Sequence, residues 1–292
     1  MIRACVVAGL VAAISVPTLA QDPAPPTLSP VGPWALEYDD TSCALSRNFG
    51  DAEKPERLEL RQYAPGTPFL GTVSSQRQPA EELKAHFRFL STNAGSSRGA
   101  SWSFESPGGG HGVSMKVYIG GPGNGTRLAS EDAERDAYEH SIEELSIAGA
   151  FADDYILKVE SMHAPLSAMR DCMIDLMSHF GLDGEAHRTL SQRAEIANLS
   201  QSWRSLRREL PKEVYAKYNA GLLPVLVFLD ETGGVTGCRR LMPLGTDAEI
   251  ASLCGALSKY TKFTPAKAAE GKPIKSLKVE GVYRVRTAVT GG

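Results

Sequence analysis

The chain has 292 residues, and its 31 lysine and arginine residues against 34 aspartate and glutamate residues give a formal net charge of −3. Hydrophobic residues make up 42% and charged residues 22%, a globular composition that excludes wholesale disorder. Because there is no large basic excess, electrostatics give no reason to expect a nucleic-acid partner. The length predicts about two domains.

The first twenty residues have the pattern of a secretory signal peptide. Arg3 supplies the positive charge, residues 4–16 are apolar or small, and Thr18 and Ala20 are small residues at the expected cleavage positions. The apolar run is shorter than the roughly 20 residues that a membrane-spanning helix needs. We therefore expect export to the periplasm with removal of residues 1–20; a signal kept as a membrane anchor is the alternative.

Export changes the interpretation of the cysteines. Removal of the signal leaves Cys43, Cys172, Cys238 and Cys254. An even number of cysteines in an oxidising compartment favours disulfides over metal binding, and four cysteines allow three pairings. No two of them have the CxxC spacing of a zinc ribbon or a redox site. We expect disulfides, no metal site and no cofactor.

Residues 21–33 contain five prolines and predict a short extended linker. The next segment, residues 34–185, is predicted to be a β-rich α+β domain whose type the residues do not reveal. Its strands are expected where apolar and polar residues alternate, or where β-forming residues run between glycine loops. These segments are residues 34–38, 58–63, 85–89, 101–104, 113–119 and 155–160.

An amphipathic helix is predicted to begin at Pro165 and to end at Gly181. Its apolar residues recur at helical spacing, and Cys172 lies beside this stripe. A helix packed over a sheet that begins at Trp34 would bring Cys172 near Cys43. We therefore expect this pair to form one disulfide, provided that the geometry allows it.

Residues 195–288 are predicted to form a second, small α+β domain after a polar connection. A helix at residues 212–219 precedes a buried strand, a turn at residues 230–234 and a return strand. Thr246 and Glu249 have the spacing of a capping box at the start of the next helix. The last strand is expected at residues 274–286, with one face formed by Leu277, Val279, Gly281, Tyr283 and Val285.

Several motifs of this second domain occur in a characteristic order. A hairpin with Gly234-Val235-Thr236-Gly237-Cys238 precedes the helix, and Phe263-Thr264-Pro265-Ala266 and Gly271-Lys272-Pro273 follow it. In this order, residues 223–285 resemble the TonB C-terminal domain family. Cysteines after the hairpin and in the helix make the segment similar to a proteobacterial variant of that family. Since Cys254 lies on the apolar side of the helix, a Cys238–Cys254 bridge would staple the helix to the sheet.

The resemblance implies a periplasmic module that binds an extended peptide of an outer-membrane transporter by strand addition. The expected docking edge is the strand from Leu277 to Val285. The chain departs from the family in lacking a long proline-rich arm, and we expect no retained anchor. We therefore expect a non-enzymatic binding protein with an envelope protein or peptide as partner and with a link to outer-membrane transport. Membrane contact would occur only through partners or an uncleaved signal, and a homodimer formed through the module is a further possibility.

The alternative function is a periplasmic, hydrolase-like enzyme with its site in the N-terminal domain. Residues 95–99 formally match the G-x-S-x-G motif, but a strand and not a helix is predicted after them. The enzyme hypothesis requires Ser97, His111 and a carboxylate to converge in one cleft.

Overall fold

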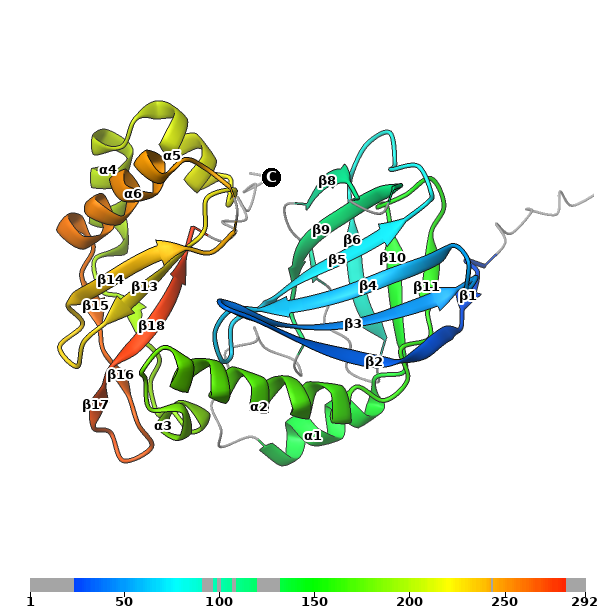
Figure 1. The fold of residues 1–292 in the computed structure, drawn as a ribbon, viewed down its shortest axis with the longest axis horizontal. Coiled ribbons are helices and arrows are strands. Elements are labelled where there is room, and N and C mark those ends of the chain that lie inside the picture. The colour runs from blue at the N-terminus through cyan, green and yellow to red at the C-terminus, as the bar shows by residue number, and fades with distance from the viewer. Residues whose placement is uncertain are drawn as a thin grey trace, which may run out of the picture.

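The computed structural model describes residues 24–90, 97–98, 101–106, 109–119, 132–242 and 244–281. The protein has an α+β fold with a larger, β-rich part and a smaller part that carries most of the later helices (Figure 1). The predicted signal peptide, residues 1–20, lies outside the described residues.

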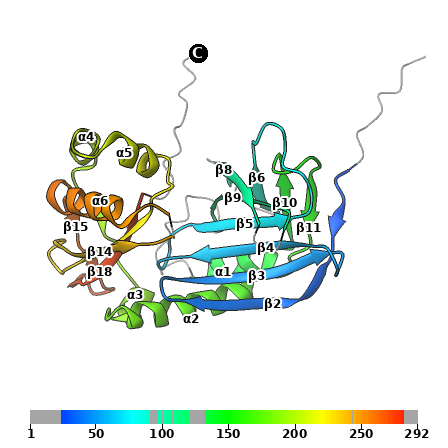
Figure 2. The ribbon, with the colours of Figure 1, turned by 45° about the horizontal axis from the view of Figure 1, so that its top comes forward.

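The larger part, residues 24–182, is called the N-terminal unit below and contains two sheets. The first sheet is antiparallel and has the order β2-β3-β4-β5-β9-β8 (Figure 2). Its strands are β2 Pro30–Asp39, β3 Ser42–Gly50, β4 Pro55–Gln62, β5 Phe69–Ser75, β9 His111–Val117 and β8 Ser101–Glu105. The second sheet has the order β1-β11-β10-β6-β7. Its strands are β1 Thr27–Leu28, β11 Tyr155–Leu157, β10 Glu144–Ala148, β6 His86–Leu90 and β7 Ser97–Arg98.

Two helices complete this unit, α1 Asp132–Ser141 and α2 His163–His179. One hydrophobic cluster joins α2 to both sheets, because the apolar stripe of the helix meets the buried face of each alternating strand. Gly181 adopts a φ of 73° after the helix, and the amides of Gly181 and Leu182 donate to carbonyl groups of its last turn. This Schellman arrangement ends the helix where the sequence predicted.

The expected proline-rich linker is more ordered than the sequence suggested. Thr27–Leu28 pairs in parallel with β11, and residues 30–33 belong to β2. Since β2 is the edge strand of its sheet, prolines that lack an amide proton are tolerated there. The pairing of β2 with β3 shifts register between Val31 and Ala35, so the strand bends within the segment expected to be a linker.

The smaller part, residues 190–281, is called the C-terminal unit. Its three-stranded antiparallel sheet has the order β14-β13-β18. The strands are β13 Val225–Leu229, β14 Val235–Arg240 and β18 Ser276–Glu280, and the helices are α4 Leu199–Glu209, α5 Lys212–Asn219 and α6 Asp247–Tyr260. Two short pairs, β12 Glu195–Ile196 with β15 Phe263–Thr264 and β16 Ala266–Lys267 with β17 Pro273–Ile274, flank this sheet. A short helix, α3 Gly184–Arg188, connects the two units.

Local contacts explain the boundaries of the C-terminal elements. The carboxylate of Asp230 accepts from the backbone amides of Thr232 and Gly234 and shapes the turn between β13 and β14. Thr246 and Glu249 form the predicted capping box at the start of α6. Residues 182–210, which the sequence predicted to be a polar, helix-compatible connection, contain α3, β12 and α4.

The C-terminal sheet is covered on both faces. Val225, Val227 and Leu229 of β13 face the helices, in a second hydrophobic cluster. Leu226 and Phe228 point the other way, toward the N-terminal unit. Burial on both faces explains why this strand is a continuous apolar run in the sequence.

The Leu277 and Val279 face of β18, the strand whose edge is expected to bind a partner, is turned toward the N-terminal unit. Leu277 is the register partner of Phe228, and Val279 is the register partner of Leu226. Both β18 side chains pack against a third cluster, which contains Tyr63 of the N-terminal unit. The face is apolar because it is half-buried inside this molecule. Tyr283 and Val285 lie outside the described residues.

Two disulfides connect helices to sheets. Cys43 of β3 pairs with Cys172 of α2, and Cys238 of β14 pairs with Cys254 of α6. Both pairs are those that the sequence favoured, and both are consistent with an oxidising compartment. None of the described helices is long and apolar enough to cross a membrane.

Removal of each disulfide should destabilise the protein by a different amount. The bridges close separations of 129 and 16 residues. In the chain-entropy view, Cys43→Ala with Cys172→Ala should lower the free energy of unfolding by about 5 kcal/mol, and Cys238→Ala with Cys254→Ala by about 3 kcal/mol. Urea denaturation without reductant measures both. A larger loss from the shorter loop would show that constraint of the unfolded chain is not the main effect.

Candidate functional site

The outer edge of β18 is one of the two edges of the C-terminal sheet that have no strand partner among the described residues. Among the described strands, β18 pairs only with β13, so its other edge has no strand partner there. Two pockets border this edge, and β18 contributes consecutive residues to both. Because successive side chains of a strand point to opposite faces, a pocket lined by consecutive residues lies along the strand edge.

The first pocket lies between the two units and has a volume of about 230 Å³. We call it the inter-unit pocket. Its walls are Ser276–Val279 of β18, the turn that follows β4 at residues 63–68, and the segment that follows α3 at residues 190–195. His187 of α3 and Met177 of α2 also line it. Both units therefore contribute to this site.

The second pocket lies between β18 and α4 and has a volume of about 180 Å³. It is lined by residues 278–281 of the chain and by Trp203 and Tyr218, whose rings stack with centroids 5.5 Å apart. Lys278, Val279 and Glu195 border both pockets. The two pockets are therefore neighbours along one line, from Ser276 to Gly281, and we call this line the edge groove.

An ion pair crosses the edge groove. Lys278 Nζ of β18 lies 3.3 Å from a carboxylate oxygen of Glu195 in β12. The Glu195 side chain is 65% exposed, so solvent screens the pair and little free energy is lost when it opens. The pair can therefore give way to a ligand that enters the groove.

The edge groove ends at Gly281, which has a φ of 82°. A Cβ atom at this position would lie 2.7 Å from both the Tyr218 ring and the Leu223 carbonyl oxygen. Gly281 is therefore a position that only glycine fills without strain.

The opposite edge of the sheet, β14, has features that discourage pairing. Its register with β13 shifts between Phe228 and Leu229, and it carries the exposed Arg239. The guanidinium of Arg239 stacks over the rings of Phe180 and Phe228 at 5.3 and 4.9 Å. Bulges and charged side chains protect edge strands from unwanted partners. The register shift and Arg239 therefore make β14 less suitable than β18 for strand addition.

His187 is the main titratable group of the inter-unit pocket that the sequence did not reveal. The residue is 6% exposed, and its Nδ1 lies 2.6 Å from the carbonyl oxygen of Asp183. Burial lowers the pKa of His187, although the Asp183 carbonyl opposes this effect. The imidazole is therefore neutral at pH 7. Nothing in its sequence spacing distinguishes it from a surface histidine of a short helix.

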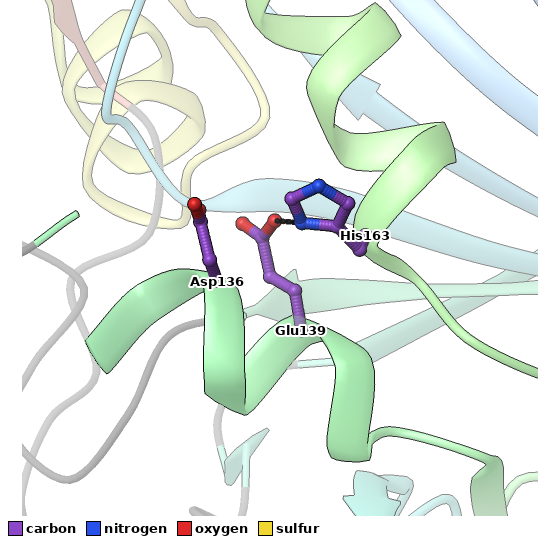
Figure 3. Close-up of side chains that lie close together, drawn as sticks. All are labelled: Asp136, Glu139 and His163. Carbon is purple, nitrogen blue, oxygen red and sulfur yellow. Dashed lines mark ion pairs between the residues drawn. The ribbon is translucent and has the colours of Figure 1, made fainter. Parts of the chain in front are cut away.

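A separate cluster of Asp136, Glu139 and His163 joins α1 to α2 (Figure 3). One oxygen or nitrogen atom from each side chain lies within 4.8 Å of the others. His163 Nδ1 is 3.5 Å from Glu139, and the His163 ring stacks on His140 with centroids 4.1 Å apart. Carboxylates and imidazole are suitable ligands for a divalent cation.

The contacts of Glu139 favour a structural role for this cluster. Arg170 of α2 donates to both Glu139 oxygens, at 2.6 and 3.1 Å, and Arg135 lies 3.8 Å from the same carboxylate. A cation would have to displace Arg170 from both carboxylate oxygens, and two guanidinium groups nearby would repel it. The bidentate pair instead ties the buried Glu139 of α1 to the longer helix.

The residues of the enzyme hypothesis do not line the edge groove. Of residues 95–99, only Ser97 and Arg98 are described, and they form β7, which pairs with β6. His111 begins β9, opposite Ser75 and Glu105. Neither Ser97 nor His111 belongs to the two pockets beside β18.

Comparisons with known proteins add no relative: no family model, no curated protein and no solved structure matches the chain.

Loss of the Glu139 carboxylate should destabilise the protein. Glu139→Gln removes the charged acceptor of Arg170 at a buried position, so the free energy of unfolding should fall by roughly 1–3 kcal/mol. Asp136→Asn is the matched control, because Asp136 is 44% exposed and should change stability by less than about 0.5 kcal/mol. Urea denaturation measures both variants. Lower stability of the wild-type protein in the presence of a chelator would contradict the structural role and indicate a bound cation.

Stability should also depend on pH through His187. Its pKa is lowered in the folded state, so below about pH 6.5 the unfolded chain takes up a proton that the folded protein does not. The free energy of unfolding should therefore fall as the pH drops below that value, and His187→Gln should reduce this dependence. The control is His179→Gln, at an exposed position. Urea denaturation at pH 7.5 and at pH 5.5 tests this; an unchanged pH dependence in His187→Gln would contradict it.

Proposed function

We propose that this protein is a non-enzymatic periplasmic binding protein that docks an extended peptide segment of an envelope protein along the edge groove. The supporting observation is the position of β18, whose outer edge has no strand partner among the described residues and borders two pockets. A peptide strand added at this edge completes backbone hydrogen bonds, and pockets beside the edge accommodate its side chains.

The dimensions of the edge groove suit a short segment. The residues that line it run from Ser276 to Gly281. At about 3.3 Å per residue, this edge accommodates roughly five or six residues of an extended peptide. The stacked Trp203 and Tyr218 offer an apolar wall for one of its side chains.

The resemblance of residues 223–285 to the TonB C-terminal domain family supports the same binding mode and favours an outer-membrane transporter as the partner. The N-terminal unit changes how such a partner would bind. Since Leu277 and Val279 pack toward Tyr63, a partner reaches the edge of β18 and not its face. We therefore propose binding without the force transduction that is usual in that family.

The proposed compartment follows from two independent features. Residues 1–20 have the pattern of a signal peptide, and the two disulfides require an oxidising environment to form. An envelope partner would be accessible to the protein there.

Site-specific photocrosslinking tests the docking edge. A benzoylphenylalanine replaces Lys278 on β18, and in a matched control it replaces the exposed Thr236 on β14, the other edge of the same sheet. In cells that export the protein, the β18 probe should crosslink to an extended segment of an envelope protein, identified by mass spectrometry. The β14 probe should give at most a small fraction of that product.

Equal crosslinking from both edges, or none from the β18 probe in folded protein, would overturn the proposal. Crosslinks between two copies of this chain through β18 would favour a homodimer instead.

A further inference from the structure

The inter-unit pocket contains two buried polar atoms that have no hydrogen-bond partner among the described residues. They are Nε2 of His187 and Oγ of Ser276, in residues that are 6% and 2% exposed. Both residues line the pocket, His187 from the connecting helix α3 and Ser276 from β18 of the C-terminal unit. A buried polar group without a partner lowers stability, and native proteins leave few of them. Two such groups in residues that line one pocket indicate that a polar ligand completes their hydrogen bonds.

The hydrogen bond of His187 specifies what the ligand must offer. A carbonyl oxygen only accepts, so the contact with Asp183 places the imidazole proton on Nδ1. In the neutral ring, Nε2 is then an acceptor, and its ligand partner must be an N–H or O–H donor. The Ser276 hydroxyl can donate or accept.

The charges around the pocket favour an anion. Three cationic side chains line it, Lys116, Arg193 and Lys278, against one acidic side chain, Glu195. The Arg193 guanidinium is held in place because it donates to the Gly66 carbonyl at 2.7 Å. Burial lowers the pKa of Arg193 despite the attraction of Glu195, so this cation gains from an added negative charge.

A neutral donor lies in the same pocket. Burial raises the pKa of Tyr63 to about 12, so its phenol remains protonated at any physiological pH. Arginine, lysine, tyrosine and serine donors together suit the two oxygens of a carboxylate. Leu190 and Leu277 add apolar surface beside them.

We propose that the inter-unit pocket binds a carboxylate of the docked peptide together with the neighbouring amide N–H, which donates to His187. This inference rests on the proposed function, because it makes the pocket the part of the edge groove that selects the peptide. The carboxylate comes either from the C-terminus of the peptide or from an acidic side chain. A volume of about 230 Å³ accommodates one residue and excludes a folded element.

Small capped amino acids test this chemistry on the oxidised, exported protein. N-acetyl-leucine carries a terminal carboxylate, N-acetyl-aspartate amide carries only a side-chain carboxylate, and N-acetyl-leucinamide carries none. Binding is followed by NMR titration, with a Kd on the order of 1 mM expected for ligands of this size. Preferred binding of N-acetyl-leucine would show that the pocket selects the C-terminal carboxylate of a peptide. Preferred binding of N-acetyl-aspartate amide would show that it selects an acidic side chain. Equal binding of N-acetyl-leucinamide, or no binding of any probe, overturns the inference.

Variants locate the binding in the pocket. Arg193→Gln should lower the affinity for the carboxylate probe about tenfold, as expected for the loss of a charged hydrogen bond. The matched control, Arg204→Gln on the exposed face of α4, should leave binding unchanged. Ser276→Ala removes a single hydroxyl that has no partner among the described residues, so it should weaken binding several-fold without loss of stability. Unchanged binding in both Arg193→Gln and Ser276→Ala would place the probes elsewhere and overturn the inference.

The two proposals fail separately. Crosslinking through the β18 probe without any binding of carboxylates would overturn the inference about the pocket and support docking at the β18 edge. Carboxylate binding without crosslinks from β18 would support the carboxylate site in the pocket and overturn docking at the β18 edge.

Discussion

The packing of the C-terminal sheet against the N-terminal unit is the contact on which the rest of this structure depends. Tyr63 and Leu70 from one unit meet Leu226 and Leu241 from the other, all less than 9% exposed. Phe180, at the end of α2, packs edge-on against Phe228 with ring centroids 5.5 Å apart. This apolar contact orients β18, covers one of its faces and leaves its outer edge as the accessible part. The inter-unit pocket exists only while the contact persists, because its walls come from both sides.

Much of the local structure follows directly from the sequence. Thr246 and Glu249 identify the start of α6, and Gly181 identifies the end of α2, because each depends on contacts within a few residues. The apolar run of β13 correctly indicates a buried strand. In these cases the physical cause of the structure lies in the same short segment as the signal.

Features that depend on distant contacts were not predictable in this way. The alternation in the last strand correctly places Leu277 and Val279 on one face, but it does not distinguish a face that meets a partner from one that packs inside the molecule. The polarity of Glu139 and His187 likewise gives no indication that both are buried. Arg170 and Asp183 hold them there, and the pairing of Glu139 with Arg170 is formed only when α1 packs on α2. The proline-rich segment was misjudged for a similar reason, since its strand conformation depends on partners in β3 and β11.

The disulfide connectivity has a consequence for biogenesis. After Cys5, the four cysteines pair in chain order. The first pairs with the second, and the third pairs with the fourth. Under the proposed export, the chain passes through a secretion channel from its N-terminus and presents its thiols in that order. An oxidase that links each newly arrived thiol to the one already waiting generates the native connectivity directly, with no need for a reshuffling catalyst. The first link closes only after 129 further residues have emerged, so the β-rich half stays uncrosslinked until α2 has arrived.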